Sequence, residues 1–172
     1  MLGDQLMEGW EEVAKIKLPD NYKTFNKIVV SGMGGSTLGA RMVKSFTFNK
    51  LKDPFEIVNG YKLPEYVDKD TLVIASSYSG NTEETVSALH DAVNRKAKVV
   101  VIATGGKIAE VTKKDRLPSY IFKPTFNPSG QPRMAIGYSI SSILGILAKL
   151  GAISLTTEDF SKAVSSSKSF IK

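Results

Sequence analysis

Residues 71–93 read TLVIASSYSGNTEETVSALHDAV. The segment 71–76 is almost continuously apolar, which is typical of a strand buried on both faces of a parallel sheet. A serine-rich polar turn follows, and residues 81–95 then carry apolar side chains at helical spacing. The segment therefore predicts a βα unit with a hydroxyl-rich turn where a central strand passes into a helix.

The same alternation of apolar runs and helical patterns continues on both sides of this unit. We expect the other strands at residues 27–33, 55–58, 98–103 and 120–122, and the other helices at 4–16, 37–47, 107–114, 131–150 and 157–170. Strands and helices joined by short turns imply right-handed βαβ units. The predicted fold class is α/β, a doubly wound, five-stranded parallel sheet flanked by helices in a flavodoxin-like three-layer sandwich. We expect an N-terminal helix within residues 1–20, the α/β domain at 21–153 and a C-terminal helix within 154–172.

The chain has 172 residues, 42% of them hydrophobic and 23% charged, which fits one soluble globular domain. The absence of cysteine excludes a disulfide framework and cysteine-ligated zinc. The N-terminus has no signal-peptide pattern and no run approaches the ~20 apolar residues of a membrane span, so we expect a cytoplasmic protein without a membrane partner. The net charge is +6, but the lysines are scattered along the sequence, so we expect no nucleic-acid partner.

A glycine-rich stretch, Ser31-Gly32-Met33-Gly34-Gly35-Ser36-Thr37, lies where the first predicted strand meets a helix. Glycines let the backbone approach a ligand closely, and a helix N-terminus offers unpaired N–H groups to an anion. The dinucleotide fingerprint G-x-G-x-x-G/A does not fit, because Thr37 stands at its last position and Asn59 replaces the expected acid. The ATP-binding P-loop pattern fails as well, because no Lys-Ser/Thr pair follows the glycines. We expect a ligand-binding loop that serves neither cofactor.

Ser77, Ser79 and Thr82 place three hydroxyls in the turn after the central strand. These hydroxyls and the N–H groups of the first helical turn converge on one place, which suits the acceptor oxygens of a phosphate monoester. Helix capping, with Glu84 completing a capping box, explains one hydroxyl and leaves two unexplained. Glu83 and Glu84 are placed to interact with the helix dipole, so we assign them a structural role.

The segment Ser77-x-Ser79-Gly80-Asn81-Thr82-x-Glu84-Thr85, after a GxGGS turn, resembles the signature of the sugar isomerase (SIS) domain family. Two later segments, GGKIAE at 105–110 and GQPRMAIGY at 130–138, resemble the N-terminal half of the bifunctional phosphoglucose/phosphomannose isomerases. The resemblance implies a sugar-phosphate substrate and neither a metal nor a cofactor. It also implies that the sugar contacts Gly34, Gly35 and Ser36, that the phosphate is held by Ser77, Ser79 and Thr82, and that Arg133 stabilises an enediolate.

Arg133 also has a physical argument of its own. It follows Pro132 at the start of the predicted helix 131–150, where a proline is tolerated. A cation at that end opposes the helix dipole, so the arginine needs a reason beyond the helix itself.

The resemblance further implies an activity, the interconversion of glucose 6-phosphate or mannose 6-phosphate with fructose 6-phosphate. This isomerisation needs a base that moves a proton between C1 and C2, and a group that opens the ring. In the family both groups come from a second SIS domain. We therefore expect this chain to be incomplete alone, with its C-terminal helix leading toward a missing second domain and with a homodimer or a second SIS half as partner. We expect the single histidine, His90, to pack or lie on the surface, because it flanks the apolar face of its helix.

Two alternatives remain open. One is a non-catalytic SIS module that senses a sugar phosphate, although such regulators carry a helix-turn-helix segment for which residues 1–20 are too short. The other is a one-domain SIS isomerase of the heptose-phosphate type, although these carry more acids and histidines around the same loops. The resemblance does not indicate whether glucose 6-phosphate or mannose 6-phosphate is the preferred substrate.

Overall fold

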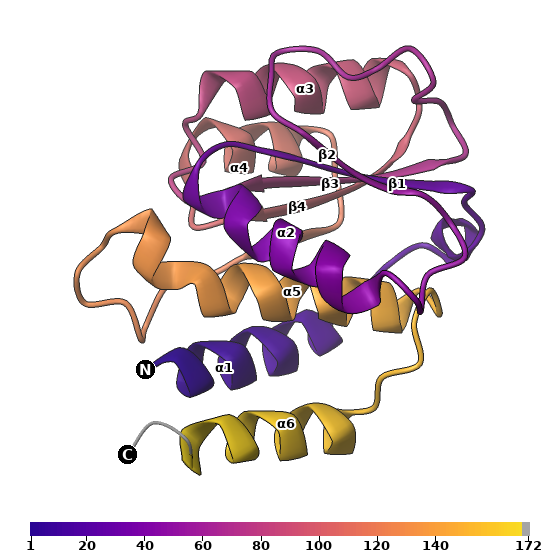
Figure 1. Ribbon diagram of the computed structural model, residues 1–172. Coiled ribbons are helices and arrows are strands. Elements are labelled where there is room, and N and C mark those ends of the chain that lie inside the picture. Colours follow the sequence, from indigo (N-terminus) through magenta and orange to yellow (C-terminus); the bar gives the residue numbers. More distant parts are fainter. Residues whose placement is uncertain (170–172) are drawn as a thin grey trace.

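The computed structural model describes residues 1–169, which form one parallel β-sheet covered by helices on both faces (Figure 1). The strands are β1 (Lys27–Gly32), β2 (Phe55–Val58), β3 (Thr71–Ser77), β4 (Lys98–Ala103) and β5 (Ser119–Ile121). The helices are α1 (Leu2–Lys15), α2 (Gly35–Thr47), α3 (Glu83–Asn94), α4 (Gly106–Lys114), α5 (Ile136–Lys149) and α6 (Thr157–Ser169). Two 3₁₀ turns, η1 (Asp20–Lys23) and η2 (Pro132–Ala135), precede β1 and α5.

The five strands run parallel in the order β2-β1-β3-β4-β5. Helices α3 and α4 cover one face, whereas α2 and α5 cover the other, and α1 and α6 extend that second side as further tiers (Figure 1). Alternate strand residues feed the two cores, so Ile74 of β3 packs toward α5 and its neighbour Val73 packs toward α3. The predicted doubly wound, five-stranded parallel sheet is confirmed.

The central strands β1 and β3 are direct neighbours, and their chains leave toward opposite faces. The pairing of Gly32 with Ser76 brings the carboxyl ends of both strands to the same edge of the sheet. From there β1 continues into α2 on one face, whereas β3 continues into α3 on the other (Figure 1). Such a switch point leaves a crevice where ligands of doubly wound folds bind.

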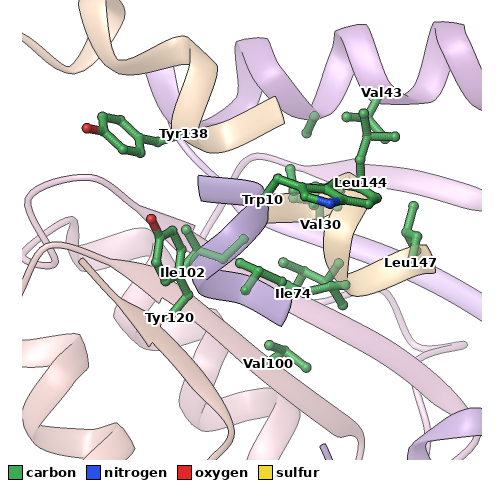
Figure 2. Packing of buried hydrophobic residues seen from close by; sticks show 14 of the residues in the cluster. Trp10, Val30, Val43, Ile74, Val100, Ile102, Tyr120, Tyr138, Leu144 and Leu147 are labelled. Atoms are coloured by element: carbon green, nitrogen blue, oxygen red, sulfur yellow. The ribbon is translucent and has the colours of Figure 1, made fainter. Parts of the chain in front are cut away.

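Helix α1 is packed tightly against α5 along a row of small residues. A Cβ on Gly9 would lie 2.2 Å from the Ser141 hydroxyl, and one on Gly145 would lie 3.0 Å from a Val13 methyl group. Trp10 of α1 reaches into the main core beside Leu144 and Val30 (Figure 2). The Trp10 ring also stacks on Phe160 of α6 with centroids 4.3 Å apart, so α6 is fastened to the body through α1.

The predicted helix 131–150 is wrong at its start. Residues Pro132–Ala135 form the 3₁₀ turn η2, in which the Met134 N–H donates to the Gln131 carbonyl, and α5 begins only at Ile136. Ala135 has φ −101° and ψ 20°, which lies outside the helical region and separates the turn from the helix. The last predicted helix is present as Thr157–Ser169, and the predicted final residue, Phe170, lies outside the described residues.

We predict that Gly39→Ala destabilises the protein although alanine favours helices. A Cβ on Gly39 of α2 would lie 2.6 Å from the Ser139 Cβ and 3.0 Å from the Ile140 amide nitrogen, so α2 and α5 would have to separate. Overpacking costs about 1–3 kcal/mol, whereas alanine gains roughly 1 kcal/mol over glycine in a helix. The 2.6 Å contact places the overpacking cost in the upper part of this range, at about 2–3 kcal/mol. Urea denaturation should therefore show the free energy of unfolding falling by about 1–2 kcal/mol.

Gly60→Ala is the matched control for this substitution, because a Cβ at Gly60 meets no atom within 4 Å. Its free energy of unfolding should stay within about 0.5 kcal/mol of the parent. A Gly39→Ala protein as stable as the parent would contradict the tight crossing of α2 and α5.

Candidate functional site

The turn after β1 and the turn after β3 are joined directly by a hydrogen bond. The Tyr78 backbone N–H donates to the buried Ser36 hydroxyl at 3.0 Å. The Asn59 side chain, at the end of β2, donates to the Gly32 carbonyl at 2.8 Å and holds the same turn from the other side. The structure thus brings the two predicted site loops together at the switch point.

Gly34 sets the shape of the first turn. It is exposed and adopts φ 54° and ψ −122° as the residue before α2, a conformation that side-chain-bearing residues avoid. Its carbonyl accepts hydrogen bonds from the Thr37 N–H at 3.2 Å and the Thr37 hydroxyl at 3.0 Å. The carbonyl therefore points into the first helical turn. The Ser36 N–H donates to the Met33 carbonyl at 3.1 Å, so among the first three N–H groups of α2 only that of Gly35 has no hydrogen bond within the described residues.

The second turn holds the three predicted hydroxyls in unequal environments. Ser77 is buried, and its hydroxyl donates to the Thr82 Oγ1 at 3.0 Å and accepts from the Gly80 N–H at 3.1 Å. Ser79 is exposed, and its hydroxyl accepts from the Asn81 N–H at 3.2 Å. Thr82 precedes α3 without capping it through its side chain. Ser77 therefore braces the turn from within, whereas Ser79 and Thr82 remain at its surface.

The segment 104–108 supports this second turn from outside. Gly80 accepts a hydrogen bond from the Ile108 N–H at 2.9 Å, and the Tyr78 carbonyl accepts one from the Thr104 hydroxyl at 2.6 Å. Gly80 has φ 70°, and a Cβ there would lie 1.7 Å from the Gly105 carbonyl oxygen. Two glycine-containing backbones thus pass in contact, and the sequence alone did not reveal this bracing role of Gly105.

The turn that carries Arg133 forms the third wall. A Cβ on Gly35 would lie 3.1 Å from the Arg133 backbone nitrogen, so the glycine admits this turn to the start of α2. Asn127 connects the same turn to the second one, because its amide donates to the Tyr78 phenol at 2.7 Å and to the Gln131 carbonyl at 3.0 Å. All predicted site segments are therefore neighbours.

Between these walls lies a cavity of about 20 Å³, lined by Gly35, Ser36, Ser76, Tyr78, Ile102, Phe122, Pro132, Ala135 and Ser139. This volume holds about one water molecule, so a sugar would bind above the cavity, at the surface of the loops. The Arg133 side chain is exposed and makes no hydrogen bond or ion pair within the described residues. Arg133 lines a neighbouring groove of about 300 Å³ beside the N-terminus of α1.

Tyr138 holds the segment that leads into the Arg133 turn. Its hydroxyl accepts from the Phe126 N–H at 3.0 Å and donates to the Glu8 carboxylate of α1. Burial raises the pKa of Tyr138 well above its usual value, and the Glu8 hydrogen bond adds to this effect. The phenol therefore stays protonated at neutral pH and keeps both bonds. The sequence did not predict this role, because a tyrosine within an apolar helix is interpreted as a residue of the hydrophobic core.

His90 is exposed on α3, as expected, and lies about 10 Å along the helix from its N-terminus. Within residues 1–169, His, Asp and Glu side chains form no group of three that could hold a metal ion. In the same part of the chain, no helix combines the length and apolarity needed to cross a membrane.

The chain is similar to known proteins along most of its length. Residues 23–116 match the SIS domain model. The chain is 41% identical over 164 residues to the bifunctional phosphoglucose/phosphomannose isomerase of Caldicellulosiruptor bescii, covering 95% of this chain and 47% of the relative. It is 37% identical over 142 residues to the enzyme of the same name from Aquifex aeolicus, covering 80% and 41%.

A solved structure shares the fold at lower identity. The tagatose-6-phosphate ketose/aldose isomerase of Escherichia coli superposes with a TM-score of 0.58 at 18% identity, covering 86% of this chain and 42% of that one. The chain spans about half the length of the curated relatives it matches. Because the SIS model matches more than half of the chain, including both loops of the switch point, the chain belongs to the SIS domain family.

Proposed function

We propose that this chain forms the sugar-phosphate-binding half of an aldose–ketose isomerase that interconverts glucose 6-phosphate or mannose 6-phosphate with fructose 6-phosphate. The observation that carries the proposal is the turn of Ser77, Ser79 and Thr82 at the start of α3, joined to the glycine turn by the Ser36–Tyr78 hydrogen bond. Hydroxyls and helix N–H groups gathered there suit a phosphate dianion. The names of the curated relatives support the same substrate class.

In this proposal each segment has its own part of the substrate. The turn of Ser77, Ser79 and Thr82 holds the phosphate, whereas Gly34, Gly35 and Ser36 lie along the sugar. Arg133 places a positive charge at the reacting carbons, where the enediolate develops negative charge. The Arg133 side chain is exposed and has no partner in the part of the chain that the structure describes, which supports this role because the guanidinium can turn toward a ligand.

The proposal assigns the base and the ring-opening group to a second SIS half. Among the described residues, the carboxylates that follow the phosphate turn directly are Glu83 and Glu84. They lie in the first turn of α3, where a negative charge interacts favourably with the helix dipole. His90 faces solvent two turns further along the same helix. We propose that the complete enzyme works as a homodimer in the cytoplasm and contains this second half.

We predict that the chain binds glucose 6-phosphate at least 100-fold more tightly than glucose. Each hydrogen bond to the charged phosphate contributes roughly 1.5–3 kcal/mol, so losing two of them costs two orders of magnitude or more. Isothermal titration calorimetry with both sugars measures the ratio. Equal affinities would contradict a phosphate site.

We predict that Ser79→Ala weakens phosphate binding about tenfold, because it removes one hydrogen bond to a charged group. Ser45→Ala is the matched control, since Ser45 is also an exposed serine and lies near the far end of α2. Glu110→Ala, on the exposed side of α4, should also leave the affinity unchanged. The thermal shift induced by 6-phosphogluconate reports all three, and an unaltered shift in Ser79→Ala would place the phosphate elsewhere.

We predict that the 172-residue chain alone has little isomerase activity and that addition of a second SIS half restores it. General acid–base groups contribute about 10²–10⁴-fold each, so the lack of both groups removes ~10⁴-fold or more. A coupled assay of glucose 6-phosphate formation from fructose 6-phosphate measures the rate. Normal turnover by the chain alone, abolished by His90→Ala or Glu84→Ala, would show instead that this domain is self-sufficient.

A further inference from the structure

Gln5 is a polar side chain buried in the seam between α1 and the rest of the domain. It is 2% exposed, and its amide nitrogen donates to the Phe126 carbonyl at 2.9 Å and the Met134 carbonyl at 2.7 Å. Its amide oxygen accepts from the Gly137 N–H at 3.1 Å. One side chain of the N-terminal helix therefore fastens the backbone at three points within residues 126–137.

These three bonds use properties that only a primary amide combines. A glutamine presents two N–H donors and one acceptor oxygen, whereas a glutamate presents no donor and a leucine neither. The Gly137 N–H is one of the first N–H groups of α5, which have no partner inside the helix, and Ala135 provides no side-chain cap. Gln5 thus caps α5 from a different helix and satisfies two buried carbonyls as well.

The position of Gln5 is fixed by packing as well as by hydrogen bonds. A Cβ on Gly137 would lie 2.6 Å from the Gln5 Cβ and 3.1 Å from the Leu2 carbonyl oxygen. Only a glycine at position 137 allows the two helices to approach this closely. The Gln5 end of α1 and the start of α5 therefore constrain each other's position.

Arg133 lies inside the segment that Gln5 fastens. It directly precedes Met134, whose carbonyl Gln5 binds, and both Arg133 and Gln5 line the groove of about 300 Å³. The other end of the turn is held by Asn127, through the Gln131 carbonyl. The backbone that carries Arg133 is thus held from both sides, while its guanidinium stays unpaired within the described residues.

We propose that Gln5 is a positioning residue for the reacting end of the sugar. Through Met134 and Gly137 it sets the conformation of the turn that presents Arg133, so α1 takes part in substrate recognition without touching the substrate. This inference rests on the proposed function, because it requires that Arg133 faces the sugar. It separates two parts of the site, since the phosphate turn has no bond to Gln5.

The test compares two ligands on the parent, Gln5→Leu, Arg133→Ala and Val13→Ala. The ligand 6-phosphogluconate carries a phosphate at one end of its carbon chain and a carboxylate at the other. Glycerol 3-phosphate carries the phosphate on a short carbon chain without a carboxylate. Gln5→Leu and Arg133→Ala should each weaken 6-phosphogluconate binding about tenfold, because a charge-assisted contact is lost. Both variants should leave the affinity for glycerol 3-phosphate within about twofold of the parent.

Val13→Ala is the stability control. Val13 is fully buried in the same seam, near the C-terminal end of α1 and against Gly145 in the second half of α5, so the variant loosens that end of α1 and leaves the contacts of Gln5 in place. It should lower the melting temperature while leaving the ratio of the two affinities unchanged. A ratio that moves equally in Val13→Ala and Gln5→Leu would reduce Gln5 to general stabilisation and overturn the proposal.

Methyl ¹³C labelling of methionine gives a readout of the turn itself. The chain has five methionines, of which Met134 adjoins Arg133 and Met42 lies on the exposed side of α2. In Gln5→Leu the Met134 resonance should shift and no longer respond to 6-phosphogluconate, while Met42 stays in place. If Gln5→Leu fails to fold, Gln5→Glu keeps the side-chain shape. The ionised carboxylate has no donor and the protonated acid has one, so at least one of the two carbonyls loses its partner and the same result is expected.

The outcomes distinguish this inference from the proposed function. If the parent binds neither phosphate ligand, the proposed function fails. If the parent binds both, and Gln5→Leu and Gln5→Glu match it in affinity ratio and in the Met134 resonance, the positioning role fails while the proposed function stands. Loss of glycerol 3-phosphate binding in Gln5→Leu would also overturn the role, because the two parts of the site would then be coupled.

Discussion

The hydrogen bond from the Tyr78 N–H to the Ser36 hydroxyl depends on the register between β1 and β3, and the candidate site depends on that bond. With Gly32 opposite Ser76, the two turns begin level with each other and diverge to opposite faces of the sheet. A slip by one residue would exchange the faces of every side chain in the strand and separate the turns. The continuous burial of both central strands resists such a slip, so the core holds the loops in place.

Close contact between backbones shapes the loops beyond this first bond. A Cβ on Gly80 would collide with the Gly105 carbonyl oxygen, and one on Gly35 would press on the backbone of the Arg133 turn at 3.1 Å. Three segments that lie far apart in the sequence can therefore offer backbone N–H groups and short hydroxyls to one small region. The loops can take this geometry because glycines allow their backbones to touch. Each glycine loses more conformational entropy on folding than other residues do, and the packing of the sheet and helices must offset this cost.

The sheet could be predicted from the sequence because buried parallel strands are apolar runs bounded by turn residues, and the five strands appear within two residues of their expected ends. The break before α5 could not, because apolar spacing continues across Pro132–Ala135 and only the backbone angles of Ala135 reveal the turn. The hydroxyl turn was predicted, and the roles of its residues stay predictions. No sequence pattern marked Asn127 as part of the site, because a single asparagine in a loop can have many structural roles. Gln5 did carry one, because it shares the buried face of α1 with Gly9 and Val13 at intervals of four residues.

The docking of α1 onto α5 has a consequence for how the chain is made. The partners of Gln5 lie 121 to 132 residues further along the sequence, so α1 leaves the ribosome well before α5, the helix on which it packs. At a translation rate of about 5–20 residues per second, this delay lasts roughly 6–30 s. During that time the face bearing Trp10 and Val13 is open to chaperones, and the sheet can assemble without it. Helix α1 is therefore synthesised long before its main partner and is among the last helices of this domain to reach its native contacts.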